Sequence, residues 1–243
     1  MFNRIFGSTF SKTLPWVFGG SRRNPIAVIT FDDHNESDLT YAYPKMSEKG
    51  WAGTSYIIPS RMAPWDHKMS EAQIVELHNN GWDVQCHSES HGNFTEMTEQ
   101  EIKDEMTSVN TFFEELNIPL PKHFAYPFGA RNDFTDSVVA DYRKTYRGTF
   151  YSYKSYFPGK LQPLIYGLPM DATTESDYNR TRDWIHKTAK DGKILILYGH
   201  RIAETSEGGH LLETYFDGYL DLIEKLGFTV MSVSELYDEF MKE

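Results

Sequence analysis

The sequence predicts a protein of the α/β class, with a mostly parallel sheet that is either doubly wound or closed into a barrel. From Pro25 onward, short apolar segments of strand character alternate with longer segments of helix character. Such alternation implies parallel strands joined by right-handed crossovers. The length of 243 residues suits one domain of this class, because α/β barrels commonly span about 200–250 residues.

The individual elements follow from apolar runs, caps and breakers. Apolar runs bounded by turn residues predict strands at 26–31, 52–58, 82–86, 123–126, 148–152, 164–168, 193–198 and 228–232. Helices are expected at 37–49, 70–80, 98–116, 133–146, 176–190, 211–226 and from 234 onward. Ser70 and Thr98 each open a capping box, Gly81 and Gly192 end helices, and Pro44 bends or breaks the first helix.

No internal repeat, low-complexity tract or linker divides this alternation. We therefore expect one domain over residues 25–243, preceded by an irregular N-terminal arm at residues 1–24. The arm lacks the continuous apolar centre of a signal peptide, and no run along the chain approaches the length of a membrane span.

Composition narrows the classes of partner. The net charge of -11 argues against nucleic acid or an anionic membrane, and a neutral or cationic substrate is easier to accommodate. Hydrophobic residues make up 40% and aromatic residues 15%, which is enough for a core and a groove. The single cysteine, Cys86, excludes an intrachain disulfide and a metal site built from several cysteines.

Two adjacent carboxylates, Asp32 and Asp33, end the first apolar strand. Two negative charges at the rim of a core are costly unless a cation lies nearby or one carboxylate is protonated. An ordinary Asp-rich turn after a strand is the alternative. His87 and His91 follow another predicted strand, and their spacing of four lets both imidazoles reach one ion. Two solvated loop histidines are the alternative there.

Two further segments carry possible chemistry. Pro127-Phe128-Gly129 is a turn whose backbone N–H groups could stabilise an oxyanion, although on local grounds it is simply a turn. His200 follows the most apolar strand, where it could transfer a proton or serve only as a structural residue. All these candidates follow the carboxyl ends of predicted parallel strands, the face where active sites of such folds assemble. We therefore expect a single site.

Four motifs occur in a defined order: Thr30-Phe31-Asp32-Asp33, His87-Ser88-x-x-His91, Tyr126-Pro127-Phe128-Gly129 and Leu197-x-x-His200-x-Ile202. In these motifs the chain, over about residues 25–240, resembles the polysaccharide deacetylases with a NodB-homology domain, or carbohydrate esterase family four. The resemblance implies a distorted (β/α) barrel, usually of seven strands. It also implies a hydrolase that removes N- or O-linked acetyl groups from an acetylated polysaccharide or glycan, with one divalent metal ion: Zn²⁺ foremost, Co²⁺ or Ni²⁺ otherwise.

The resemblance also assigns roles to residues. It implies that Asp33, His87 and His91 bind the metal, and that Asp32 is the general base. The backbone N–H of Phe128 would stabilise the oxyanion, and His200 would protonate the leaving group. Substrate contacts are expected at Tyr126, Pro127, Trp184, Leu197 and Tyr198, with core packing as the alternative for Trp184.

One departure from the family pattern concerns the neighbour of the base. Many members place an arginine three residues before the oxyanion residue, paired with a downstream aspartate, but Ala125 stands there in this chain. The segment resembles a bacterial subgroup without this arginine. Asp171 is then a candidate supporting residue, and an ordinary turn aspartate is the alternative. The remaining histidines are expected at the surface or in packing, with only His34 near the site.

Two other functions remain as alternatives: a C–N hydrolase of ureides or cyclic imides on the same scaffold, and a catalytically silent carbohydrate-binding module. The intact motifs favour the deacetylase over both. A deacetylase that acts on a polysaccharide favours an extracellular or cell-envelope location. The sequence does not indicate the oligomeric state.

Overall fold

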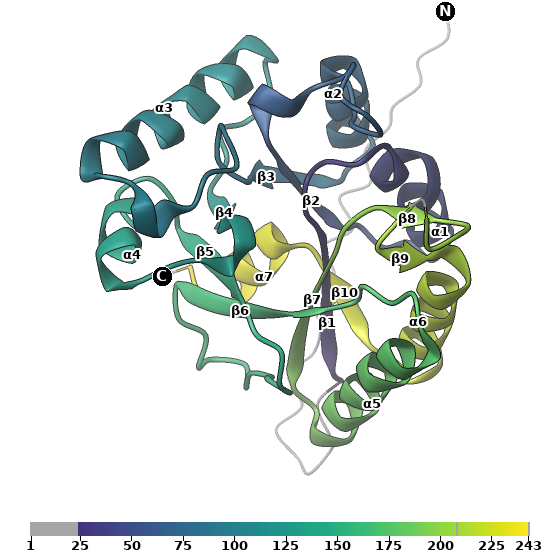
Figure 1. The fold of residues 1–243 in the computed structure, drawn as a ribbon. Coiled ribbons are helices and arrows are strands. Elements are labelled where there is room, and N and C mark those ends of the chain that lie inside the picture. Colours follow the sequence, from purple (N-terminus) through teal and green to yellow (C-terminus); the bar gives the residue numbers. More distant parts are fainter. Residues whose placement is uncertain (1–23, 208, 243) are drawn as a thin grey trace, which may run out of the picture.

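Seven parallel strands close into a barrel in the computed structural model, which describes residues 24–207 and 209–242 (Figure 1). Each strand pairs with the next in sequence, and the last pairs with the first. The strands are β1 (Ile26–Phe31), β2 (Thr54–Ile57), β3 (Asp83–Cys86), β4 (His123–Ala125), β5 (Thr145–Thr149), β6 (Leu164–Pro169) and β7 (Ile194–Gly199). The expected fold class is confirmed, and the sheet closes rather than staying open.

The barrel is distorted at β1. All six residues of β1 pair with β7, but only Thr30 and Phe31 pair with β2. Beside the first half of β1 lies β10 (Thr229–Met231), which pairs with Ile26–Val28. A separate two-stranded sheet joins β8 (Ile202–Ala203) to β9 (Leu211–Leu212), just beyond β7.

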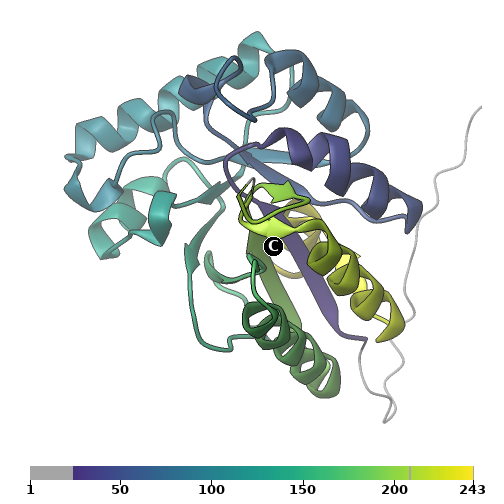
Figure 2. The same ribbon diagram turned by 45° about the vertical axis from the view of Figure 1, so that its right-hand side comes forward.

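Helices surround the strands on the outside of the barrel (Figures 1 and 2). They are α1 (Tyr43–Glu48), α2 (Glu71–Asn79), α3 (Glu99–Glu115), α4 (Asp133–Val139), α5 (Glu175–Asp191) and α6 (Glu213–Lys225). The last helix, α7 (Val233–Phe240), reaches the amino ends of the strands, where the N–H of Val233 donates to Thr54 at the start of β2. No helix in the described part of the chain is long and apolar enough to cross a membrane.

Alternation along each strand divides the core in two. Ile26, Val28, Ile194 and Ile196 belong to a cluster inside the barrel, which Val233 of α7 also joins. The residues between them point outward and pack with the helices in a larger cluster. This period of two follows from the pleat of the backbone. It decides which side chains at the strand ends can reach the barrel mouth.

Local signals explain most boundaries. Ser70 and Thr98 form the predicted capping boxes, and Gly192 ends α5 in the left-handed conformation with φ 61°. The first helix begins with a π-helical turn at Asp38–Ala42, and Pro44 lies in the first turn of α1, where its missing N–H costs nothing. The predicted arm at 1–24 lies outside the described residues except for Asn24.

One boundary differs from the prediction in a way that matters for the site. The helix expected over 133–146 ends at Val139, and the strand expected at 148–152 is β5, Thr145–Thr149. The N–H of Lys144 donates to the carbonyl of Lys122, which brings the chain back to β4 before Thr145. Strand pairing therefore overrides helix propensity in this segment, and Arg147 lies inside a strand.

Candidate metal and catalytic site

Asp33, His87 and His91 come together beyond the carboxyl ends of β1 and β3. Their ligand atoms all lie within 4.8 Å of one another. Asp33 Oδ1 is 3.5 Å from His87 Nε2 and 3.3 Å from His91 Nε2. This oxygen is buried and accepts no hydrogen bond from the described residues. A buried carboxylate oxygen needs a partner, and two imidazole nitrogens beside it complete the donor set of a divalent metal site.

His87 is held in the tautomer that a metal ligand requires. Its Nδ1 lies 2.7 Å from the carbonyl oxygen of Ala125. Because a carbonyl only accepts, Nδ1 carries the proton and the lone pair of Nε2 points toward Asp33 and His91. Burial lowers the pKa of His87 to about 4, so the imidazole is neutral near pH 7. These three residues can therefore hold a divalent metal ion.

Asp33 stays ionised despite its burial. Burial by itself would raise its pKa, but the neighbouring His91 and His87 imidazoles and the Lys68 ammonium outweigh burial and hold that pKa well below the ordinary range. Oδ2 faces Lys68, whose Nζ lies 3.8 Å away. The carboxylate therefore has one oxygen toward the histidines and the other toward a cation.

The backbone of the site is strained. Asp33, His91 and Phe128 have φ angles of 71°, 58° and 59°, and His34 and Ser88 beside them are also positive. The left-handed region costs a residue with a side chain about 1–3 kcal/mol, and such residues cluster where function requires an exact orientation. Three of the sequence-predicted site residues therefore occupy conformations that folding alone disfavours.

Asp32 forms a buried ion pair that the sequence analysis missed. Arg147 Nη2 lies 2.6 Å from Oδ1 and 2.5 Å from Oδ2 of Asp32, and both side chains are almost completely buried. Burial raises the pKa of Asp32, but the guanidinium reverses this and leaves the pKa below its ordinary value. Arg147 therefore keeps the carboxylate ionised inside the barrel mouth.

The surroundings of Arg147 are built to hold a planar cation. Its guanidinium carbon lies 4.7 Å from the ring centroid of Tyr198 and 5.5 Å from that of Tyr56. Gly167 on β6 leaves room for the Arg147 side chain and the Tyr198 ring, because a Cβ at this position would lie 3.0 Å from both. In the sequence, Arg147 stands next to Gly148 in a segment that could be a buried strand. A charge in a buried strand needs a partner, and this was the signal that could have indicated the ion pair.

His200 is paired with Asp171. Asp171 Oδ2 is 2.6 Å from His200 Nδ1, and Oδ1 accepts from the backbone N–H of His200 at 2.9 Å. Burial disfavours the imidazolium, but Asp171 outweighs it and raises the pKa of His200 to about 9. Asp32 and Asp33 lie close enough to contribute to that rise. His200 is therefore protonated near pH 7, with its Nε2–H free for transfer.

Phe128 lies at the edge of the cluster formed by Asp33, His87 and His91. Its ring meets the ring of His91 edge-to-face, with centroids 4.6 Å apart, and the side chain is 67% exposed. Gly129 follows with φ 65°, and a Cβ on it would collide with Thr149. The turn is thus wedged between β4 and β5, which fixes the position of the Phe128 backbone.

The five residues expected to contact substrate are all buried. Leu197 is fully buried and points to the outer helices, because residues alternate along β7. Tyr126 points outward in the same way, and its hydroxyl donates to Asp136. Pro127 is buried, Trp184 packs in the outer core, and Tyr198 is covered by Arg147. These residues pack around the site, and the expectation that they contact substrate stays a prediction.

Exposed aromatic side chains stand at the carboxyl ends of the strands instead. They are Phe128 after β4, Tyr151 after β5 and Trp65 after β2, and each is more than half exposed. Flat apolar faces of this kind suit stacking against a sugar ring. His34, which the sequence placed near the site, is buried and pins the adjoining loop, accepting from Ile58 N–H and bonding the carbonyl of Arg61.

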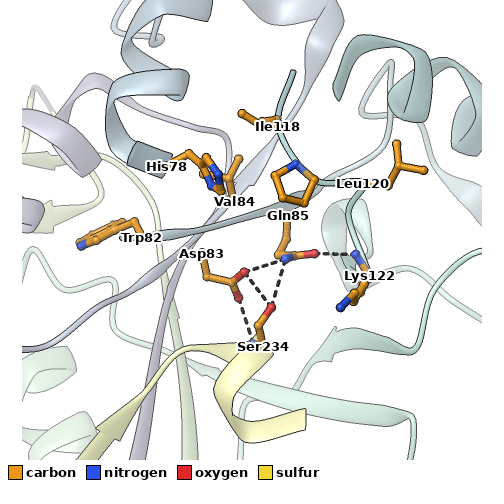
Figure 3. Close-up of a pocket in the computed structure, with 10 residues that line it drawn as sticks. His78, Trp82, Asp83, Val84, Gln85, Ile118, Leu120, Lys122 and Ser234 are labelled. Atoms are coloured by element: carbon orange, nitrogen blue, oxygen red, sulfur yellow. Dashed lines mark hydrogen bonds between the residues drawn. The ribbon is translucent and has the colours of Figure 1, made fainter. Parts of the chain in front are cut away.

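A pocket at the opposite end of the barrel is structural (Figure 3). It lies at the starts of β3 and β4 and has a volume of about 170 Å³. Asp83 there accepts from the N–H and hydroxyl of Ser234, and Gln85 accepts from the N–H groups of Lys122 and His123. These polar groups are satisfied by one another, and they tie α7 to the bottom of the barrel.

The chain belongs to the polysaccharide deacetylase family, whose model matches residues 19–146, just over half of the 243 residues. A curated relative, "Putative polysaccharide deacetylase YxkH" of Bacillus subtilis (strain 168), is 26% identical over 108 residues. That match covers 44% of this chain and 38% of the relative, so the chain spans well under half of that protein's length.

Solved structures share the fold at low identity. The Xyl-CE4 domain of a multidomain xylanase from the hindgut metagenome of Trinervitermes trinervoides has a TM-score of 0.62 and 18% identity, over 89% of this chain and 91% of that one. The peptidoglycan deacetylase PdaC of Bacillus subtilis has a TM-score of 0.59 and 15% identity, over 90% and 92%. BA3943 of Bacillus anthracis, a CE4 family pseudoenzyme, has a TM-score of 0.61 and 15% identity, over 90% and 67%. The fold therefore occurs with and without activity, and only the site can distinguish the two.

Proposed function

We propose that this chain is a metal-dependent deacetylase that removes acetyl groups, N- or O-linked, from an acetylated polysaccharide or glycan. The observation that carries the proposal is the cluster of Asp33, His87 and His91, with His87 locked in the ligand tautomer beside an ionised Asp32. A pseudoenzyme or a purely sugar-binding module has no need for this set. The family membership supports the same reaction class.

Asp33, His87 and His91 would hold one divalent ion, for which two nitrogen donors and one oxygen donor favour zinc, with cobalt or nickel as alternatives. When bound, such an ion supplies Lewis-acid chemistry: it lowers the pKa of a water molecule and polarises a carbonyl oxygen. Three protein ligands leave coordination positions free, as catalytic rather than structural sites do.

Asp32 would act as the general base. Its carboxylate takes a proton from the attacking water while the water oxygen bonds to the acetyl carbon. Arg147 holds the carboxylate by Nη2 and prevents it from turning toward Asp33. Positioned proton transfer of this kind contributes about 10²–10⁴ to the rate.

Phe128 and His200 would complete the reaction. The backbone N–H of Phe128 would donate to the acetyl oxygen as negative charge develops there. His200 would give the proton on Nε2 to the leaving nitrogen or oxygen as the C–N or C–O bond breaks. Asp171 supports this role because it binds Nδ1 and keeps the imidazole protonated. The products are acetate and a free amine or alcohol.

Acetate release from a panel of N- and O-acetylated glycans tests the proposal. The panel is run with chelator-treated protein and with the same protein after zinc, cobalt or nickel is restored, and a ureide and a cyclic imide are included. We expect release that disappears on chelation and returns with metal. Full activity after chelation would contradict the mechanism, and turnover of only the ureide or imide would favour the other C–N hydrolase.

A further inference from the structure

Lys68 reaches the expected metal ligand Asp33 from a different loop. It lies on the segment after β2, and its side chain is only 13% exposed. Its Nζ lies 3.8 Å from Asp33 Oδ2 and donates to Asn35 Oδ1 at 2.9 Å. Among residues 24–207 and 209–242, Asp33 is the only carboxylate within 4.0 Å of this Nζ. A lysine that is this deeply buried needs such a partner, so the contact differs from the exposed ion pairs on the outer helices.

The position of Lys68 is fixed at its backbone and at the end of its side chain. The N–H of Glu36 donates to the carbonyl of His67 at 2.8 Å, and Asn35 lies opposite Lys68 in an antiparallel bridge. Asn35, which holds the Nζ, is itself anchored, because its Nδ2 donates to the carbonyl of Asp32 at 2.9 Å. The loop after β2 is thus joined to the segment after β1, and the ammonium group is held beside Asp33.

The two carboxylate oxygens of Asp33 therefore have different surroundings. Oδ1 lies 3.5 Å from His87 Nε2 and 3.3 Å from His91 Nε2, whereas Oδ2 faces Lys68. Oδ1 is buried and accepts no hydrogen bond from the described residues. A carboxylate can bind a metal ion through one oxygen or through both. With a cation beside Oδ2, only Oδ1 is free to share an ion with the two imidazoles.

From this arrangement we propose that Lys68 is a positioning residue that restricts Asp33 to binding the metal ion through one oxygen. The inference rests on the proposed function and concerns the same site. Without the ammonium group, the carboxylate would be free to turn both oxygens toward the ion, and the site would lose a positive charge that repels it. Both changes should tighten metal binding.

The restriction matters for catalysis as well as for affinity. A second oxygen from Asp33 would fill a coordination position that catalytic metal sites leave open for water and substrate. Lys68 therefore weakens metal binding and keeps that position open. A variant without this cation should combine tighter metal binding with a lower kcat, a combination that a purely structural lysine would not produce.

The test measures metal binding by metal-free protein, which is titrated with Co²⁺ and followed by the absorption of the bound ion. The Kd of Lys68→Met should be smaller than that of the wild type by about tenfold or more, the effect of removing a unit charge about 4 Å from the ligand. Lys68→Arg keeps the positive charge and should stay near the wild-type Kd. Lys45→Met is the matched control, because Lys45 pairs with Asp217 on the outer helices.

The absorption spectrum of bound Co²⁺ reports the number of ligands, since its visible bands weaken as the coordination number rises. We expect weaker bands for each bound ion in Lys68→Met than in the wild type, and no change in Lys68→Arg or Lys45→Met. Lys68→Gln keeps a donor for Asn35 but removes the charge, so it gives the same comparison where Lys68→Met does not fold.

Three results would contradict the inference. A wild-type Kd and spectrum in both neutral variants, or a larger Kd, would overturn it and leave the proposed function standing. A smaller Kd with an unchanged spectrum would show charge repulsion alone and would overturn the restriction to one oxygen. Failure of the wild-type protein to bind Co²⁺ would overturn the proposed function and this inference together.

Discussion

Arg147 Nη2 contacts both carboxylate oxygens of Asp32, at 2.6 and 2.5 Å, inside the mouth of the barrel. In many members of the family an arginine stands at the position of Ala125, on β4. The guanidinium comes instead from the neighbouring strand β5. The carboxylate that would act as the base therefore has a cationic partner from β5.

Removal of Arg147 should destabilise the protein strongly. Arg147→Met leaves the buried Asp32 without its partner, and breaking a buried ion pair on one side costs about 3–5 kcal/mol. The double variant Asp32→Asn/Arg147→Met should be more stable than Arg147→Met alone, because it buries no unpaired charge. Chemical denaturation of the three proteins checks this. Equal stability of the single and double variants would show that the pair carries no such energy.

Asp171 should set the alkaline limit of activity. The pKa of His200 is raised from the ordinary value near 6.5 to about 9, so the imidazole is protonated at neutral pH and loses its proton as pH rises through about 9. A bound metal ion would move this limit downward. In Asp171→Asn the pKa should fall back toward 6.5, and the descending limb of the kcat profile should move to lower pH by at least one unit.

A pH–rate profile of wild type and Asp171→Asn, each with restored metal, measures this shift. Asp177→Asn, which changes an aspartate at the start of α5, is the control and should leave the limb in place. An unchanged limb in Asp171→Asn would mean that His200 is not the group that titrates.

Gly129 should be intolerant of a side chain. Its φ of 65° and its contact with Thr149 leave no room for a Cβ. Gly129→Ala should displace the Phe128 backbone and lower kcat by about 10²-fold or more, the cost of losing an oxyanion donor. Gly159→Ala is a matched control, because Gly159 has φ 79° but nothing within 4 Å of an added Cβ. A similar kcat in the two variants would show that the backbone position of Phe128 does not contribute to catalysis.

The metal content of purified variants should distinguish His87 from a histidine outside the site. His87→Ala removes a donor whose tautomer is fixed by Ala125, so the purified protein should lose most of its metal. His186→Ala, an exposed histidine on α5, should keep it. Elemental analysis of both proteins after the same purification decides the point. Full metal content in His87→Ala would exclude His87 as a ligand.

The sequence was informative where chemistry and strand ends coincide. Asp33, His87 and His91 could be grouped because each follows the carboxyl end of a parallel strand, and parallel strands end on one face. The α/β class with a parallel sheet and both capping boxes followed from pattern alone, and the closed barrel followed from the family resemblance. In these places local signals and tertiary structure agree.

The sequence was less informative where a side chain's position depends on register or on packing at long range. Leu197 and Tyr126 lie next to the motifs, but alternation along the strands turns both away from the barrel mouth. Arg147 was missed because the boundary between α4 and β5 was placed several residues too late. Lys68 contacts Asp33 from a loop whose position is fixed by hydrogen bonds of His34 that no motif records.

The central claim is that Asp33 serves as a ligand and Asp32 as a free base, although the two are adjacent in the chain. Asp32→Asn keeps all three ligands, so the variant should bind metal like the wild type and lose about 10²–10⁴ in kcat. Metal content and acetate release, measured on one sample of this variant, test the claim directly. A full complement of metal with almost no acetate is the predicted result. A full complement of metal with near-wild-type acetate release would contradict the account.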